Sequence, residues 1–169
     1  MKRTVILLAA LLLAGWFFLP HPLEANDAEL AAVVRIRSLF PANASSTATY
    51  GRERLGNGVV IDAEGTILTL SFLTREAERI EVIGPDSQPV TAALIGVDYG
   101  SGLSLLKPSQ PLRVAPIEIG KSAAVGIGDF AIVAGAGNEG QVQMTRVVSR
   151  QEFAGTWEYY LDSAIFTAP

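Results

Sequence analysis

The feature that most constrains the fold of this chain is a succession of short apolar or alternating segments separated by turn-forming residues. Segments of this length, bounded by Gly, Pro, Asp and Ser, are typical of strands in β-barrels and β-sandwiches. The candidate strands cover residues 33–37, 58–62, 66–71, 79–83, 90–97, 103–107, 129–134, 142–148 and 159–162. The pattern therefore predicts an all-β fold.

The segments between the candidate strands support antiparallel pairing. Residues 62–65 read D-A-E-G and residues 84–87 read G-P-D-S, and both carry the residues that hairpin turns require. Only residues 26–32 and 74–78 are predicted to be helical. Residues 41–54 are polar and rich in Ala, Ser and Thr without periodicity, so we expect a mobile surface loop there.

The N-terminus has the composition of an export signal. Lys2 and Arg3 precede an uncharged run at residues 4–19, which is shorter than the roughly 20 residues of a spanning helix. Ala25 suits the last position of a leader, although Leu23 lies where a small residue is preferred. We therefore expect an exported protein, periplasmic or secreted. The alternative is an uncleaved leader, in which residues 4–19 anchor the protein to the inner membrane and provide its only membrane contact.

Composition excludes several classes of function. The chain has 13 Lys and Arg, 17 Asp and Glu, no cysteine and one histidine, His21, which lies in the leader. Zinc sites and disulfides built on cysteine are excluded, and without a run of basic residues nucleic acid is not an expected partner. Catalysis by a Ser-His-Asp or Cys-His set uses a histidine as its base, and the chain after the leader has no histidine. We expect no metal and no other cofactor.

Two segments resemble phosphate-binding motifs. Residues 115–122 end in Gly-Lys-Ser, but Pro116 has no amide proton to offer, Glu118 repels phosphate, and glycines interrupt any helix that should follow. Residues 135–140 read G-A-G-N-E-G, and Asp162 follows at about the spacing of a ribose-binding acid. A dinucleotide-binding motif requires a helix after its glycines. Residues 141–148 instead alternate polar and apolar side chains and are rich in Val and Thr, which is typical of a strand. A dinucleotide-binding fragment therefore remains only as an alternative.

One resemblance covers most of the chain. The segment at residues 55–69, L-G-N-G-V-V-I-D-A-E-G-T-I-L-T, resembles a run of the HtrA/Do-type trypsin-like serine proteases nearly residue for residue. Further matching segments follow the same order, at residues 33–37, 94–98, 103–107, 114–116, 128–135 and 161–165. The resemblance implies a double β-barrel with peptide-bond hydrolysis in the cleft between the barrels. It divides the chain into a leader (1–25), a helix, first strand and loop (26–54), a first barrel (55–110) and a partial second barrel (111–169).

The same resemblance implies which residues occupy the catalytic positions. The general base falls at Phe72, and the acid that orients it falls at Gly102. Phenylalanine accepts no proton and glycine has no carboxylate. The nucleophile would fall just beyond Pro169, so the resemblance also implies a second barrel that is incomplete at the C-terminus, without the oxyanion hole.

Replacement chemistry finds little support in the sequence. Ser104 and Lys107 lie three residues apart on a predicted strand and therefore point to opposite faces. Asp98, near the acid position, is interpreted as a turn or capping carboxylate. We expect a catalytically inactive exported homologue that binds a peptide or protein through an exposed sheet edge, or acts in assembly. The alternative is an active serine endopeptidase with an unrecognised base.

Overall fold

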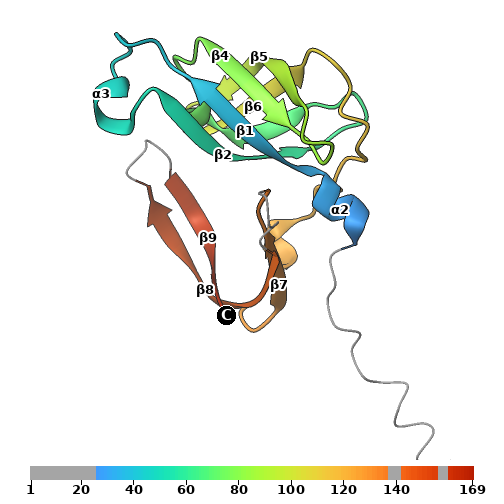
Figure 1. Ribbon diagram of the computed structural model, residues 1–169. Coiled ribbons are helices and arrows are strands. Elements are labelled where there is room, and N and C mark those ends of the chain that lie inside the picture. The colour runs from blue at the N-terminus through green and yellow to red at the C-terminus, as the bar shows by residue number, and fades with distance from the viewer. Residues whose placement is uncertain (1–25, 137–141, 156–159) are drawn as a thin grey trace, which may run out of the picture.

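The structure, a computed structural model of the 169-residue chain, describes residues 26–136, 142–155 and 160–169. It is nearly all β, with one closed barrel and a separate sheet beneath it in the view of Figure 1. The elements are α2 (Asp27–Ala31), β1 (Val33–Leu39), α3 (Thr47–Tyr50), β2 (Glu53–Val60), β3 (Ile67–Leu70), η2 (Ser71–Leu73), β4 (Arg79–Ile83), β5 (Pro89–Asp98), β6 (Leu103–Pro108), η3 (Ser122–Ala124), β7 (Phe130–Ala134), β8 (Val142–Ala154) and β9 (Tyr160–Ala168).

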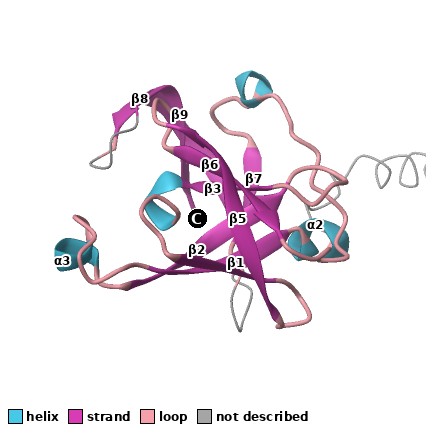
Figure 2. Ribbon diagram, turned by 90° about the horizontal axis from the view of Figure 1, so that it is seen from above, coloured by secondary structure: helices cyan, strands magenta, loops and turns pink. Residues whose placement is uncertain are grey.

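The barrel closes in the order β1-β2-β3-β6-β5-β4, with antiparallel neighbours throughout. The two predicted hairpins are confirmed, since residues 62–65 join β2 to β3 and residues 84–87 join β4 to β5. The first turn is stabilised by the Asp62 carboxylate, which accepts from the Thr66 amide at 2.8 Å. Gly65 has a φ of 77°, a conformation that favours glycine. The two helices α2 and α3 lie at opposite ends of β1 (Figure 2).

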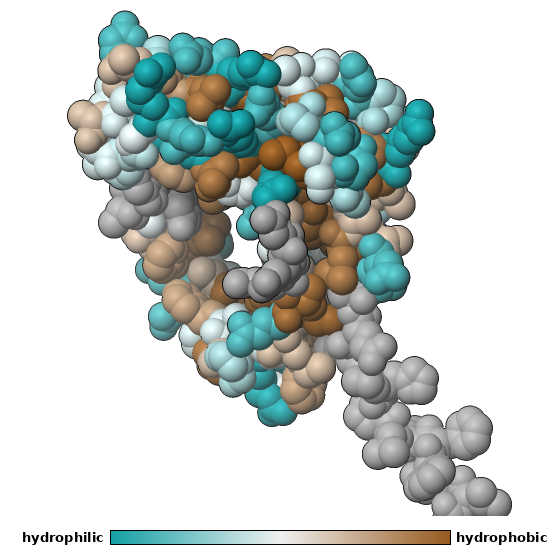
Figure 3. All heavy atoms as spheres, viewed as in Figure 1, coloured by the Kyte–Doolittle hydropathy of each residue, from teal (hydrophilic) through white to brown (hydrophobic). Residues whose placement is uncertain are grey.

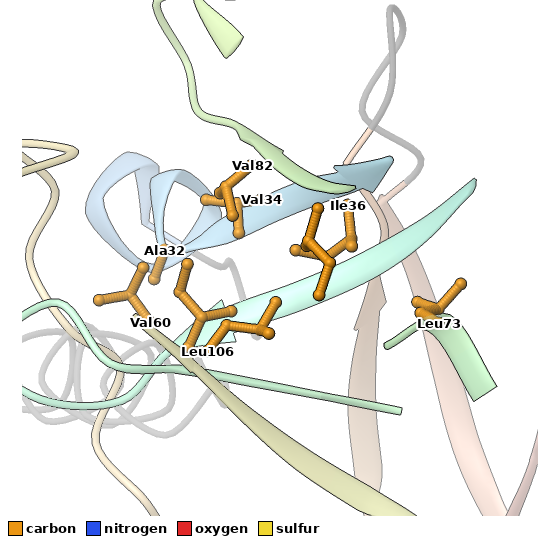
Figure 4. Close-up of a cluster of buried hydrophobic side chains, with 9 residues drawn as sticks. Ala32, Val34, Ile36, Val60, Leu73, Val82 and Leu106 are labelled. Atoms are coloured by element: carbon orange, nitrogen blue, oxygen red, sulfur yellow. The ribbon is translucent and has the colours of Figure 1, made fainter. Parts of the chain in front are cut away.

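The barrel core follows from period-two alternation. In β1, Val34 and Ile36 are buried, whereas Arg35 and Arg37 face outward. Each large apolar side chain buried in this way contributes roughly 1.5–3 kcal/mol of transfer free energy. Figure 4 labels the side chains that gather from several strands, namely Ala32, Val34, Ile36, Val60, Leu73, Val82 and Leu106.

The second sheet has the order β7-β8-β9, again antiparallel, and it does not close within the described residues. The Asn57 side-chain oxygen on β2 accepts from the Ala136 amide at 3.0 Å and ties the sheet to the barrel. Brown apolar residues border the opening between the two parts (Figure 3). This arrangement confirms the predicted all-β fold with a complete first barrel and a partial second one. Over the described ranges, no helix is long and apolar enough to cross a membrane.

Two local predictions were wrong. Residues 74–78 do not form a helix: the three-residue η2 ends at Leu73, before this range, and Glu76 has a φ of 68°, which an α-helix does not allow. Residues 41–54 are not a featureless loop, because they contain α3 and the first residues of β2. The boundary placed between residues 54 and 55 therefore falls inside β2, and β1 belongs to the barrel.

Candidate functional site

The structure places the two positions that the resemblance aligns with a base and an acid on adjacent segments. Phe72 is the middle residue of η2, which directly follows β3, and Gly102 directly precedes β6. Strands β3 and β6 pair with Leu70 opposite Leu103, and the Ser71 amide donates to the Gly102 carbonyl at 2.8 Å. The residues that the resemblance aligns with a base and its orienting acid are therefore neighbours across one hydrogen bond.

The backbone of Gly102 is held in a conformation that is unfavourable for a residue with a side chain. Its φ is 70°, it is buried, and its amide donates to the Asp98 carbonyl at 3.0 Å. The left-handed region costs a residue with a β-carbon about 1–2 kcal/mol. The backbone at this position is therefore shaped for a glycine, and a carboxylate here would strain it.

The ring of Phe72 packs in a cluster built around a buried cation. The guanidinium carbon of Arg54 lies 3.7 Å from the centroid of the Phe40 ring, 5.0 Å from that of Phe72 and 5.4 Å from that of Tyr50. The Tyr50 and Phe72 rings meet edge to face at 5.9 Å. Arg54 itself is only 5% exposed. We call Phe40, Tyr50 and Phe72 the aromatic cage, since three rings surround one guanidinium.

Polar groups complete the surroundings of Arg54. Its Nη1 donates to the Phe72 carbonyl at 2.8 Å, and its Nη2 donates to the Ser46 hydroxyl at 2.6 Å. The hydroxyls of Ser46 and Ser45 in turn donate to the two carboxylate oxygens of Glu76, at 2.8 and 2.9 Å. The Nε of Arg54 is buried and has no hydrogen-bond partner. The Ser46 hydroxyl therefore links the buried guanidinium of Arg54 to the exposed carboxylate of Glu76 through two hydrogen bonds.

The titratable groups of this cluster are poorly suited to proton transfer near neutral pH. Burial lowers the pKa of Arg54, but an arginine pKa lies so high that the side chain stays charged. Hydrogen bonds from Ser46 and Ser45 lower the pKa of Glu76, which makes its carboxylate a weaker base. The arrangement around Phe72 holds a cation and packs rings together.

The replacement chemistry considered from the sequence is not assembled. Ser104 is buried and its hydroxyl accepts from Thr74 Oγ1 at 2.8 Å, whereas the exposed Lys107 amine donates to the Glu64 carbonyl, so the two side chains do not meet. Asp98 is confirmed as a turn carboxylate, because it accepts from the Gly100 amide at 2.9 Å and the Ser101 hydroxyl at 2.7 Å. These bonds, the Ser101 hydroxyl first, lower the pKa of Asp98.

The phosphate-site alternatives are also unsupported. After Gly-Lys-Ser the chain forms only the three-residue η3, which offers no helix N-terminus for a phosphate. β7 and β8 pair antiparallel with Ala134 opposite Val142, whereas a dinucleotide fold requires parallel strands joined by a helix. Residues 137–140 of that motif lie outside the described residues, as do His21 and the leader. The ranges that the structure describes contain no cluster of His, Cys, Asp and Glu able to hold a metal ion.

Sequence reasoning missed the buried Arg54 and the aromatic cage, because it assigned residues 41–54 to a loop. A signal was present. Gly58 and Val60 face the barrel interior, and the period of two places Arg54 on the same inner face once β2 is extended toward its N-terminus. An arginine at an inner position predicts a paired or ring-stacked guanidinium.

Comparison with known proteins gives consistent matches. The family model described as "Trypsin-like peptidase domain" matches residues 56–169. The periplasmic pH-dependent serine endoprotease DegQ of Escherichia coli is 36% identical over 84 residues, which cover 49% of this chain and 18% of DegQ. The serine endoprotease DegS of Salmonella typhimurium is 28% identical over 116 residues, 68% of this chain and 33% of DegS.

Solved structures agree with these sequence matches. The HtrA-type protease AlgW with tripeptide superposes with a TM-score of 0.60 at 25% identity, over 73% of this chain and 38% of AlgW. The chain thus spans less than half the length of each of these relatives.

Proposed function

Because the chain belongs to the trypsin-like peptidase family and to its HtrA/Do type, we propose that it is a catalytically inactive homologue that binds an extended peptide or protein partner. The observation that carries the proposal is the packing of Phe72. The position that the resemblance aligns with the general base holds a phenylalanine. The centroid of the Phe72 ring lies 5.0 Å from the guanidinium carbon of the buried Arg54. The second departure is at Gly102, whose carbonyl accepts from the amide of Ser71, the residue before Phe72.

The unpaired edge of the second sheet supports a peptide partner. Strand β9 pairs with β8, and no strand of the described residues pairs with its other edge. Tyr160, Leu161 and Ile165 on β9 are exposed, and the strand carries one charge, Asp162. An edge with so few charges and no proline is poorly protected against the addition of a further strand.

Export belongs to the same proposal. DegQ is named as a periplasmic enzyme, and the uncharged run at residues 4–19 behind Lys2 and Arg3 is typical of an export signal. We propose that the protein acts in the periplasm or after secretion.

The catalytic half of the proposal is tested with purified protein and two assays. A fluorophosphonate probe and unfolded casein are each incubated with the protein, with a mock preparation and with DegQ as an active relative. We expect neither labelling nor cleavage above the mock preparation. Labelling of a serine together with casein cleavage would overturn the proposal in favour of an endopeptidase with an unrecognised base.

The binding half is tested by fluorescence anisotropy with labelled unfolded casein. Leu161→Lys places a charge on the β9 edge, whereas Ile119→Lys places the same charge on an exposed segment outside both sheets. We expect Leu161→Lys to weaken binding at least about fivefold, roughly 1 kcal/mol for one lost edge contact, and Ile119→Lys to bind as the parent does. Equal binding by both variants would remove β9 as the docking edge.

A further inference from the structure

The aromatic cage encloses Arg54 as a binding site encloses a ligand. A guanidinium within about 6 Å of several ring faces is the geometry in which proteins recognise organic cations. Here three rings contribute at 3.7, 5.0 and 5.4 Å, and the Phe72 carbonyl and Ser46 hydroxyl each accept one N–H. The site thus has apolar walls and directional acceptors, and its ligand comes from the same chain.

The parts of the cage come from segments that are otherwise separate. Arg54 lies on β2, Phe40 directly follows β1, Tyr50 ends α3, and Phe72 lies on η2. Residues 41–52, which include α3, connect β1 to β2, and they reach η2 and its following turn through Tyr50, Ser45 and Ser46. We call residues 41–52 the strap.

We propose that Phe40, Tyr50 and Phe72 form a guanidinium-binding cage whose ligand is the chain's own Arg54, and that this internal ligand holds the strap closed against η2. The inference goes beyond the proposed function, since it concerns how Arg54 and the cage hold the strap in place and not whether the protein cleaves peptides. Removal of the ligand leaves a cage for a free guanidinium ion and releases the strap.

The first experiment is a chemical rescue. Arg54→Ala empties the cage, whereas Arg79→Ala removes an arginine that is exposed on β4. We expect guanidinium ion at low millimolar concentration to raise the melting temperature of Arg54→Ala relative to equal concentrations of sodium chloride and of urea, which has the same planar shape without the charge. Arg79→Ala and the parent should show no such difference. Equal melting temperatures of Arg54→Ala in guanidinium and in sodium chloride would overturn the cage.

The second experiment does not depend on the folding of Arg54→Ala. Tyr50 is 40% exposed, so Tyr50→Leu removes one wall of the cage with little loss of core packing. Hydrogen exchange is followed at the amides of Thr47 and Gly51, which donate within the strap to the carbonyls of Ala44 and Thr47.

We expect exchange at these amides to rise about fivefold in Tyr50→Leu, the factor that corresponds to the loss of one partly exposed cation–π contact. The matched control is Tyr99→Leu, because Tyr99 is also exposed and also lies over an arginine, Arg75, at 6.0 Å. It should leave both amides unchanged. Unchanged exchange in Tyr50→Leu would show that the cage does not hold the strap. Neither experiment measures peptidase activity, so their outcome is independent of the proposed function.

Discussion

At the scale of single residues, the two positions that the resemblance aligns with a catalytic base and acid are held by packing and by backbone hydrogen bonds. Phe72 contributes its ring to the aromatic cage and its carbonyl to Arg54, and Gly102 contributes a left-handed turn that closes on Ser71. A proton-transfer site needs a base that is solvated or paired with an acid. The residues around Phe72 instead bury a permanent cation. Under the proposed function, we therefore expect that a single substitution here would not create a peptidase.

The substitution Phe72→His tests this at the position itself. The imidazole would lie beside the Arg54 guanidinium in a half-buried site, and both the neighbouring cation and the loss of solvent disfavour its charged form. We expect its pKa to fall below the ordinary value of about 6.5. An NMR titration measures it, with Ile119→His on an exposed segment as the reference. A pKa at or above that of the reference would contradict the account.

Glu76 should make stability depend on pH in the acid range. Hydrogen bonds from Ser46 and Ser45 lower its pKa in the folded state from the ordinary 4.5. Its ionised form therefore stabilises the fold above pH 4.5, and this contribution is lost as the pH falls through the lower folded pKa. Urea unfolding between pH 5 and pH 3 should show a smaller loss of stability for Glu76→Gln than for the parent.

Ser46→Ala provides the complementary variant for this prediction, because it removes the largest cause of the shift and leaves the carboxylate in place. Its pH profile should also be flatter than that of the parent. Parallel profiles for all three proteins would mean that the hydrogen bonds to Glu76 have the same free energy in both protonation states.

At the scale of elements, alternation was sufficient to predict the strands. Residues 79–83 were predicted as a strand and form β4 with the same bounds, and both hairpin turns join antiparallel neighbours. Such segments are predictable because one face of each strand must be buried, and that requirement is visible as a period of two. Strand ends were less accurate: β8 continues to Ala154, well beyond the predicted residue 148.

The elements around the candidate site could not be predicted in this way. Helix α3 has four residues and η2 has three, so neither is long enough to show an amphipathic period. Their positions are determined by tertiary contacts, above all by the buried Arg54, whose partners are up to 18 residues away in the chain. The assignment of Phe72 and Gly102 to catalytic positions rests on the resemblance alone and stays a prediction. The local sequence pattern did not predict the aromatic cage.

Close packing between barrel strands gives a prediction for Gly58. A β-carbon on this residue of β2 would meet Ile67 Cγ2 at 2.6 Å and Ile36 Cδ1 at 3.1 Å. Both isoleucines are fully buried, so they have little room to move. We expect Gly58→Ala to lower the free energy of unfolding by about 1–3 kcal/mol, the usual cost of an overpacked core, as measured by urea denaturation. Gly120→Ala is the control, since no atom lies within 4 Å of its β-carbon, and equal stabilities would contradict the packing.

At the scale of the whole molecule, the two β parts differ in what they leave exposed. The barrel is closed and has a continuous apolar core. The described part of the second sheet exposes large apolar side chains on all three strands, among them Phe130, Met144 and Tyr160. Apolar surface of this extent is typical of a docking surface or of a region that aggregates. The proposed partner would therefore be expected to bind the second sheet and leave the barrel unchanged.

The proposed export leads to a final prediction. The second sheet can bind its partner in solution only if the leader is removed, because an uncleaved leader would hold the protein at the membrane. The proposed leader ends at Ala25, but Leu23 occupies the position where the processing enzyme prefers a small residue. In a bacterial host we expect a periplasmic product that begins at Asn26, identified by mass spectrometry of its N-terminus. Leu23→Ala should increase the processed fraction, whereas Leu23→Phe should decrease it. If all three proteins remained in the membrane fraction with residues 1–25 attached, the run at residues 4–19 would be the anchor, and binding by the second sheet would take place at the membrane surface.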